Sequence, residues 1–427
     1  MTMLTDRWAE FAQDARDSGN ETISLWRKTR MKRIIAILLA GVLALAAMTG
    51  CAPQTANGSD GRVIKIGVYE PATGEDGAGG RQETLGIRYA NSVQPTVAIG
   101  GETYRVQLVL ADNESSVEKG PTVAAALAEA GVSLVLGSYG SGVSLAASDV
   151  FERAGIPAIG VTCTNPQITA GNQYYFRICF LDPFQGAVLA NYAAETLGAK
   201  KAYCLARLGN DYSAGLCSYF IGAFQSLGGE VVYETFSEGE TDFTPYITAA
   251  VNEGAEVFFA PVSTEAGALL IAQAAEHGLD VPLLAGDTWD SNVITAAVRG
   301  TDLPVYVSTF FDEGTDREAG RSFVDGFKAW LNSDADAMAD NGGNDMVSAA
   351  SAMGYDAYFT ALEAIKTAGS VEPAAIHAAL WNTTYSGATG DIAFDGENGD
   401  AIRSEACIKQ VDNASGAWRF VAMQKAD

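Results

Sequence analysis

Leu134-Val-Leu-Gly-Ser-Tyr-Gly-Ser-Gly-Val143 is followed, after a short segment, by Ile156-Pro-Ala-Ile-Gly-Val-Thr-Cys-Thr164. The first three residues form an apolar run that suits a buried strand. Apolar residues then recur at helical spacing until Gly155 and Pro157 end the helix. A second strand is expected over Pro157–Val161. This stretch therefore predicts a strand, a helix and a further strand of an α/β fold.

Hydroxyl side chains follow both of these expected strands: Ser141 lies after the first, and Thr162 and Thr164 lie at the end of the second. In an open parallel sheet the ligand crevice lies outside the carboxyl ends of the strands. A helix N-terminus offers unpaired N–H groups and a positive dipole end, which suit a carboxylate. The pattern indicates an anion cradle for a small ligand, although an ordinary strand–turn–helix would fit these residues as well.

Composition narrows the class of protein. The chain has 427 residues, 48% of them apolar and 19% charged, which is enough for two or three globular domains. A net charge of −25 argues against nucleic acid and anionic membrane surfaces as partners. The glycine-rich run lacks the Lys-Ser/Thr of a P-loop, only two histidines exist, and no metal-ligand cluster is apparent. We therefore predict no enzyme activity, no cofactor and no metal.

The N-terminal region resembles a bacterial lipoprotein signal peptide. Met31-Lys-Arg33 is basic, residues 34–48 are apolar but too short to span a membrane comfortably, and Met48-Thr-Gly-Cys51 resembles a lipobox. The resemblance implies a leader over residues 1–50, lipidation of Cys51 and a flexible tether over 51–62. Because acidic residues precede the basic cluster, we expect translation to start at Met31. A plain secretory signal with a chance cysteine is the alternative.

Five further cysteines are an odd number, so at least one thiol should be free unless it pairs between chains. Cys204 and Cys217 flank an expected strand-to-helix turn and could form a disulfide, which an extracytoplasmic compartment permits.

The remaining chain alternates short apolar strands with helices of 10–15 residues, which predicts βαβ units and parallel sheets. We expect a first lobe over residues 63–181 and 311–388, and a second over 182–310 and 389–427. A strand over 305–310 is expected to return to the first lobe. Residues 331–345 are expected to form a loop, and residues 389–420 closing strands or a hairpin.

Several longer motifs resemble the leucine/isoleucine/valine-binding protein family, the type I periplasmic binding proteins of ABC importers. They are V-I-K-I-G-V-Y-E-P-A-T-G from Val63, A-G-I-P-A-I-G-V-T-C-T-N-P from Ala154, Y-Y-F-R-I-C-F-L-D-P-F-Q-G from Tyr174, A-G-D-T-W-D-S from Ala285 and M-G-Y-D-A-Y from Met353. The resemblance covers about residues 63–423. It implies two Rossmann-like lobes joined by a three-segment hinge, which close on a ligand held between them.

The resemblance also implies roles for individual residues. Ser141, Thr162 and Thr164 match positions that hold the ligand α-carboxylate. The family's acidic residue for the ligand ammonium aligns with Thr288, and we assign its role to Asp287, one residue earlier. Tyr212 matches a family tyrosine of the second lobe.

Two further aromatic residues join the expected site: Tyr139 would point toward the ligand side chain, and Trp289 would stack or line the pocket. Core packing of both aromatics and helix N-capping by Asp287 are the structural alternatives. Two other family tyrosines fall on Gly79 and near Val262 or Ser263. These departures imply a pocket of different size or polarity.

Together these observations predict a solute-binding lipoprotein on the extracytoplasmic face of a bacterial membrane. It would act as a monomer that binds an amino acid or similar small zwitterion, delivers it to ABC permease subunits and contacts the membrane only through its lipid. A sensor of the same fold that signals to a regulator is the alternative.

Overall fold

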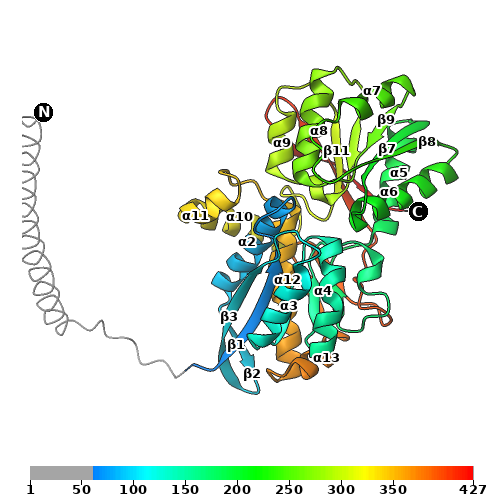
Figure 1. Cartoon of the computed structure of the whole chain (residues 1–427). Coiled ribbons are helices and arrows are strands. Elements are labelled where there is room, and N and C mark those ends of the chain that lie inside the picture. Colours follow the sequence, from blue (N-terminus) through cyan, green and yellow to red (C-terminus); the bar gives the residue numbers. More distant parts are fainter. Residues whose placement is uncertain (1–60, 427) are drawn as a thin grey trace, which may run out of the picture. The chain divides into compact units, whose positions relative to one another are not determined.

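The computed structural model describes residues 61–426 of the chain. The predicted leader over 1–50, the start at Met31, the lipidation site Cys51 and the tether up to residue 60 lie outside the described residues. Within the described part, two large sheets flanked by helices form two α/β lobes (Figure 1). The predicted architecture of two doubly wound lobes is confirmed.

The first lobe contains a six-stranded sheet in the order β2-β3-β1-β4-β5-β6. The strands are β1 Val63–Glu70, β2 Thr96–Ile99, β3 Glu102–Asp112, β4 Leu134–Leu136, β5 Ala158–Gly160 and β6 Tyr175–Arg177. All pairs are parallel except that of β2 with β3. Because the strand order reverses between β1 and β4, a ligand crevice is expected outside the carboxyl ends of these two strands.

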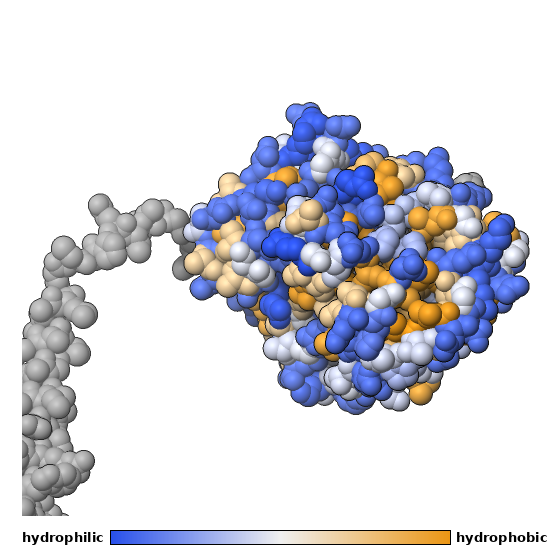
Figure 2. All heavy atoms as spheres, turned by 90° about the horizontal axis from the view of Figure 1, so that it is seen from above, coloured by the Kyte–Doolittle hydropathy of each residue, from blue (hydrophilic) through white to orange (hydrophobic). Residues whose placement is uncertain are grey.

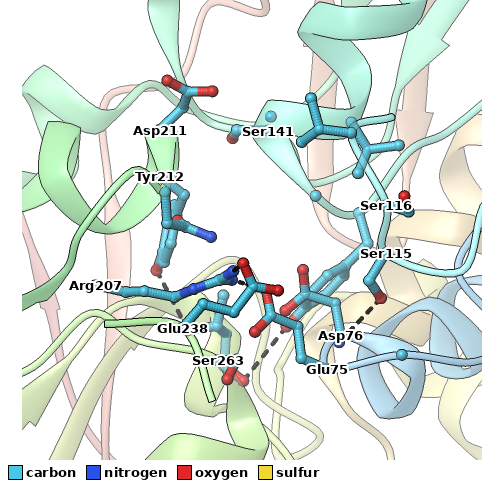
Figure 3. A pocket seen from close by; sticks show the side chains of 18 of the residues that line it. Glu75, Asp76, Ser115, Ser116, Ser141, Arg207, Asp211, Tyr212, Glu238 and Ser263 are labelled. Atoms are coloured by element: carbon cyan, nitrogen blue, oxygen red, sulfur yellow. Dashed lines mark hydrogen bonds and ion pairs between the residues drawn. The ribbon is translucent and has the colours of Figure 1, made fainter. Parts of the chain in front are cut away.

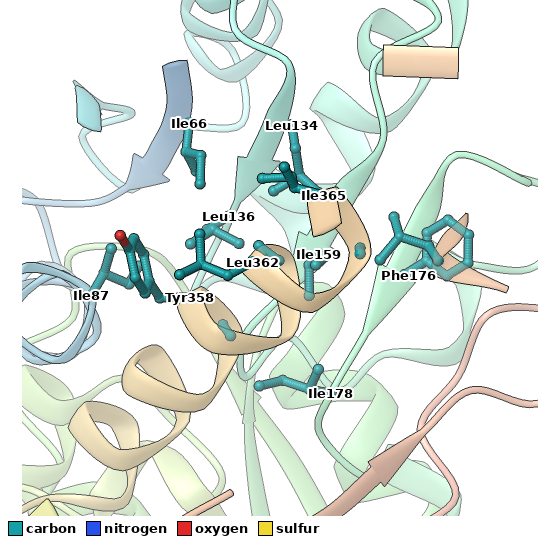
Figure 4. Packing of buried hydrophobic residues seen from close by; sticks show 14 of the residues in the cluster. Ile66, Ile87, Leu134, Leu136, Ile159, Phe176, Ile178, Tyr358, Leu362 and Ile365 are labelled. Carbon is teal, nitrogen blue, oxygen red and sulfur yellow. The ribbon is translucent and has the colours of Figure 1, made fainter. Parts of the chain in front are cut away.

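Helices cover both faces of the first sheet. They are α2 Gly77–Val93, α3 Gly120–Glu129, α4 Ser141–Ala154, α10 Glu318–Ser333, α11 Ala335–Asp340, α12 Ala349–Ala368 and α13 Pro373–Leu380, with a 3-10 turn at Pro166–Ile168. Helices α2, α12 and α13 pack on one face, and α3 and α4 pack on the other. Figure 4 shows Tyr358, Leu362 and Ile365 of α12 against strand residues such as Leu136 and Ile159.

The second lobe contains a seven-stranded sheet in the order β15-β14-β11-β10-β9-β7-β8. Its strands are β7 Lys201–Arg207, β8 Glu230–Phe236, β9 Val257–Phe259, β10 Leu283–Ala285, β11 Val305–Thr309, β14 Ala406–Asp412 and β15 Ala417–Gln424. Its helices are α5 Asp182–Asn191, continued by a π-helical turn at Tyr192–Thr196, α6 Asp211–Ser226, α7 Thr244–Asn252, α8 Thr264–Glu276 and α9 Asn292–Val298, with a 3-10 turn at Asp287–Trp289. The order β8-β7-β9-β10-β11 repeats that of the parallel strands in the first lobe, so its switch point lies between β7 and β9.

The chain passes between the lobes three times: after β6, after β11 and before β14. The expectation that residues 305–310 form a strand of the returning chain is wrong. β11 instead pairs with β10 and β14 in the second sheet, because its apolar residues Val305 and Val307 complete that lobe's core.

The last crossing comes later than the predicted boundary at residue 389. A hairpin of β12 Thr384–Gly387 and β13 Gly390–Ala393 precedes it. Ile392 and Phe394 pack into the apolar core of the first lobe, and this packing holds the hairpin there. The chain re-enters the second sheet only at β14.

The five cysteines outside the leader, Cys163, Cys179, Cys204, Cys217 and Cys407, are all buried and free. The possible Cys204–Cys217 disulfide is therefore not formed. Both residues instead pack as small apolar side chains in one core cluster of the second lobe.

The surface viewed from above in Figure 2 shows hydrophobic residues in separate patches among hydrophilic ones. Within residues 61–426, no helix combines the length and apolar character needed to cross a membrane.

Candidate functional site

A cavity of about 420 Å³ lies between the two lobes (Figure 3). Loops that follow β1, β3, β4 and β5 of the first sheet line it, as do loops that follow β7, β8, β9 and β10 of the second. The cavity thus lies outside the carboxyl ends of both sheets and next to both switch points. Its volume is in the range typical of small-molecule sites.

Ser141 lies at the N-terminus of α4, where the chain turns from β4 into the helix. Residues Gly140–Val143 line the cavity, and no side chain caps the first turn of the helix. The first N–H groups of this helix therefore have no partner within the helix and lie beside the cavity. The Ser141 hydroxyl, which is buried, accepts a hydrogen bond of 3.3 Å from the backbone N–H of Asn165 and retains its own proton for a ligand.

The two threonines differ in their position. Thr162 lines the cavity, but its hydroxyl donates to the carboxyl group of Glu83 and would have to turn to reach a ligand. Burial raises the pKa of Glu83 to about 7. Thr164 is fully buried and is not among the residues that line the cavity. Its carbonyl accepts a 3.0 Å hydrogen bond from the N–H of Asp182 at the start of α5.

Asp287 and Tyr212 face the cavity from the second lobe. The Asp287 Oδ1 atom accepts hydrogen bonds from Gln185 Nε2 at 3.0 Å and from the Tyr212 hydroxyl at 3.2 Å. Burial raises the pKa of the Asp287 carboxyl to about 7, against the lowering effect of these two donors. Asp287 begins a 3-10 turn, yet its side chain does not cap it. This arrangement favours a ligand-facing carboxylate over the capping alternative.

Tyr139 bridges the two lobes. Its N–H donates to Glu70 Oε2 at 2.7 Å, and its hydroxyl donates to the carbonyl of Thr288 at 3.3 Å. A Cβ added at Gly79 would lie 2.3 Å from the Tyr139 ring, so the absent side chain at Gly79 provides the space that the ring occupies.

Trp289 is fully buried in the apolar core of the second lobe and is not among the cavity residues. Its indole N–H donates to the carbonyl of Val262 at 3.1 Å. Trp289 is therefore a core residue, which was the structural alternative to a pocket role. The indole fits there because α8 has Gly267 at the point of contact, where any larger residue would collide with the ring.

Carboxylates dominate the remaining lining, and most of them are not among the site residues expected from the sequence. Seven carboxylate side chains line the cavity: Glu75, Asp76, Glu114, Glu118, Asp211, Glu238 and Asp287. Arg207 is the one cationic residue among the lining residues. Figure 3 shows Glu75, Asp76 and Glu238 gathered near its guanidinium group.

Arg207 joins the two lobes through an ion pair with Glu75. It also pairs with Glu238 of its own lobe at 3.0 Å. Both carboxylates thus share one guanidinium, and none of its charge is left over for an anionic ligand.

Two carboxylates approach the first turn of α4. If Gly140 carried a Cβ, that atom would lie 3.4 Å from Asp76 Oδ2. A Cβ on Gly142 would lie 3.2 Å from Asp211 Oδ2. Burial raises the pKa of Asp76 to about 7, and neighbouring Glu75 raises it further while Arg207 lowers it. A ligand carboxylate at the helix N-terminus would therefore bind close to protein carboxylates.

The described residues contain no group of three or more His, Cys, Asp or Glu side chains arranged to hold a metal ion.

Two doubly wound lobes, joined by three crossings and enclosing a cavity at their switch points, define a type I periplasmic binding protein. The chain belongs to the leucine/isoleucine/valine-binding family of periplasmic binding proteins, and it matches the periplasmic binding protein family over residues 63–416. Members of this family bind solutes rather than catalyse reactions, and membership indicates an extracytoplasmic location.

Among curated proteins, the chain is 28% identical over 363 residues to a Leu/Ile/Val-binding protein homolog 1 from Brucella abortus, which covers 84% of this chain and 93% of the relative. It is 32% identical over 298 residues to an amino acid binding protein from Pseudomonas aeruginosa, with 68% and 77% covered.

Among solved structures, the leucine binding protein LivK from Thermotoga maritima is similar, with a TM-score of 0.76, 32% identity, and 85% of this chain and 99% of that chain covered. The substrate binding protein LivJ from Streptococcus pneumoniae, solved with isoleucine, gives a TM-score of 0.74 at 25% identity, with 85% and 99% covered.

Proposed function

We propose that this protein binds an amino acid or a similar small zwitterion between its lobes and delivers it to the permease of an ABC importer. The observation that carries the proposal is the pairing, across one cavity, of the uncapped N-terminus of α4 with the buried carboxyl of Asp287. The first suits a carboxylate and the second an ammonium group. The amino-acid-binding relatives support this assignment.

Closure of the lobes follows from differential affinity. A ligand that contacts Ser141 in the first lobe and Asp287 in the second makes both contacts only when the lobes are together, so it favours the closed state. The interlobe contacts of Tyr139 with Thr288 and of Glu75 with Arg207 belong to that state. The closed form would then be recognised by the permease.

A thermal-shift screen of the purified protein tests this function. The twenty amino acids, together with urea and small amides, are added singly at 1 mM, because a ligand that binds only the folded state raises its stability. We expect at least one amino acid to raise the melting temperature, and calorimetry then to give its affinity. If no amino acid raises the melting temperature of protein freed of co-purified ligand, the proposal is wrong.

Binding of the best amino acid from this screen should strengthen with pH. Asp287 has a raised pKa of about 7, and the ligand ammonium binds its charged form. Below pH 7 the carboxyl must lose a proton before it can pair, so affinity should be about tenfold lower at pH 6 than at pH 8. Other titratable groups lie near Asp287: Tyr139 and Tyr212 line the cavity, and Glu83, Asp182 and Asp290 lie outside its lining.

Calorimetry at both pH values measures this effect, with Asp287→Asn as the comparison. The variant should bind more weakly and show a smaller change with pH. Equal pH dependence of the two proteins would exclude Asp287 as the ammonium partner.

We further propose that Cys51 carries the lipid that anchors the protein, on the strength of the Met48–Cys51 lipobox. Mass spectrometry of the mature N-terminus provides the test: a diacylated Cys51 is expected, and an unmodified N-terminus elsewhere would contradict it.

A further inference from the structure

The charge of the cavity is not balanced within the protein. Among its seven carboxylates, Glu75 and Glu238 pair with Arg207, and Glu114 pairs with Lys119. Within residues 61–426, four others have no ion-pair partner: Asp76, Glu118, Asp211 and Asp287. A ligand of zero net charge would leave this excess of negative charge in place when the lobes close.

Among the described residues, Asp287 has no cationic partner. The residue is 8% exposed, and both hydrogen bonds to its carboxyl end on Oδ1. In the described chain Oδ2 accepts no hydrogen bond, nor is it enclosed by protein, so it is open to the cavity that Asp287 lines. Because the residue as a whole is more than nine-tenths buried, this open carboxylate oxygen calls for a donor from the ligand.

Asp76 provides a second such position in the opposite lobe. It lies in the loop between β1 and α2 and is half-buried. Its backbone N–H donates to Ser115 Oγ at 3.1 Å and its carbonyl accepts from the N–H of Gly80 at 3.1 Å, whereas within residues 61–426 its carboxylate accepts no hydrogen bond. Its carboxylate approaches the first turn of α4, where the ligand carboxylate would bind. A zwitterion alone would bring its negative end toward Asp76, which is unfavourable unless a further positive charge accompanies it.

The lining also offers little to an aliphatic side chain. Val117 and Val143 are its only aliphatic residues larger than glycine, and the rest is polar, charged or tyrosine. A leucine-like side chain would therefore bury apolar surface against carboxylates, which gives little hydrophobic stabilisation.

We propose that the ligand carries two cationic groups, as a basic amino acid does, and that Asp287 binds the first and Asp76 the second. This inference rests on the proposed function, since it assigns the ligand class of the same cavity. The side-chain cation neutralises the carboxylates that flank α4, and it allows the ligand carboxylate to reach Ser141.

Calorimetry with L-lysine and L-norleucine tests the inference, because the two differ only in the terminal amino group. At pH 7.5 we expect lysine to bind at least tenfold more tightly. Asp76→Asn should weaken lysine binding by ~10–100-fold and change norleucine binding by less than about threefold, as the loss of one charged hydrogen bond implies.

Asp325→Asn is the matched control, since it removes the same charge from an exposed position on α10 away from the cavity. It should leave both affinities unchanged, and equal losses in the two variants would show a general charge effect and overturn the assignment of Asp76. Norleucine or leucine binding as tightly as lysine would overturn the inference and leave the proposed function standing.

A third probe, 1,5-diaminopentane, carries both cationic groups without a carboxylate. Much weaker binding than lysine supports the full assignment. Binding equal to that of lysine would keep the dicationic ligand but refute the carboxylate cradle at Ser141, and thereby the zwitterion of the proposed function.

Discussion

Replacing Arg177 with Met should lower the free energy of unfolding by about 3–5 kcal/mol, the usual cost of removing one partner from a buried ion pair. Arg177 is fully buried at the end of β6 and pairs through Nε with Asp400. Methionine preserves much of the side-chain length, so the loss reflects the charge and the hydrogen bonds rather than a large cavity. Urea unfolding followed by circular dichroism measures the change.

The other donors of Arg177 explain why the effect reaches the site. The guanidinium donates to the carbonyls of Cys163 at 3.1 Å, Asn165 at 2.6 Å and Pro166 at 3.3 Å. These carbonyls belong to the loop that follows β5 and contains Thr164 and the hydrogen-bond partner of Ser141. Asp400 lies between β13 and β14, in the segment that crosses back to the second lobe. The Arg177 side chain therefore connects the loop after β5 to this crossing segment.

Arg153→Met is the control for this prediction. Arg153 is exposed in the last turn of α4, and its ion pair with Asp149 is 3.9 Å long with both side chains more than 70% exposed. Such an exposed ion pair contributes little to stability, so the free energy of unfolding should change by less than about 0.5 kcal/mol. If the two variants lost similar amounts of unfolding free energy, the buried network around Arg177 would contribute nothing to stability.

The parts of the fold that the sequence predicts are those governed by local pattern. The run from Leu134 and the helix from Ser141 follow from apolar spacing and from Gly155, which ends α4 with φ of 67°. Hydrophobic periodicity fixes such elements because each buries one face against its neighbours.

Two of the elements that the sequence analysis did not predict have short signals. Residues 335–340 form α11 inside the expected loop, where Asp334 caps the N–H groups of Asp336 and Ala337. The β2–β3 hairpin turns at Gly100 and Gly101, both with positive φ. A Gly-Gly pair between short apolar runs is a recognised hairpin signal, so this hairpin could have been predicted.

The acidic lining of the cavity could not be predicted in the same way. Asp76, Asp211 and Glu238 come from loops far apart in the sequence, and only the packing of two lobes brings them together. Each alone resembles an ordinary exposed loop residue. That carboxylates of both lobes would share Arg207 could not be predicted either, because the contact with Glu75 forms only when the lobes are closed.

Gly86→Ala should destabilise the protein by about 3 kcal/mol, at the upper end for an overpacked site. A Cβ on Gly86 of α2 would lie 1.9 Å from the carbonyl oxygen of Ser351 on α12, and one on Gly354 would lie 2.3 Å from the carbonyl oxygen of Glu83. The two helices therefore touch backbone to backbone through reciprocal glycines. Because backbone atoms cannot rotate away as a side chain can, one added methyl group must push the helices apart.

Gly222→Ala on α6 gives the opposite expectation and serves as the control. Nothing lies within 4 Å of a Cβ at Gly222, and alanine is the better helix former. The free energy of unfolding of this variant should therefore rise by ~0.5–1 kcal/mol. Thermal and urea unfolding of both variants measure the difference. A Gly86→Ala protein as stable as the parent would show that α2 and α12 can separate at little cost. Because α2 follows directly after the loop that carries Asp76, such freedom would also loosen the position of that carboxylate in the cavity.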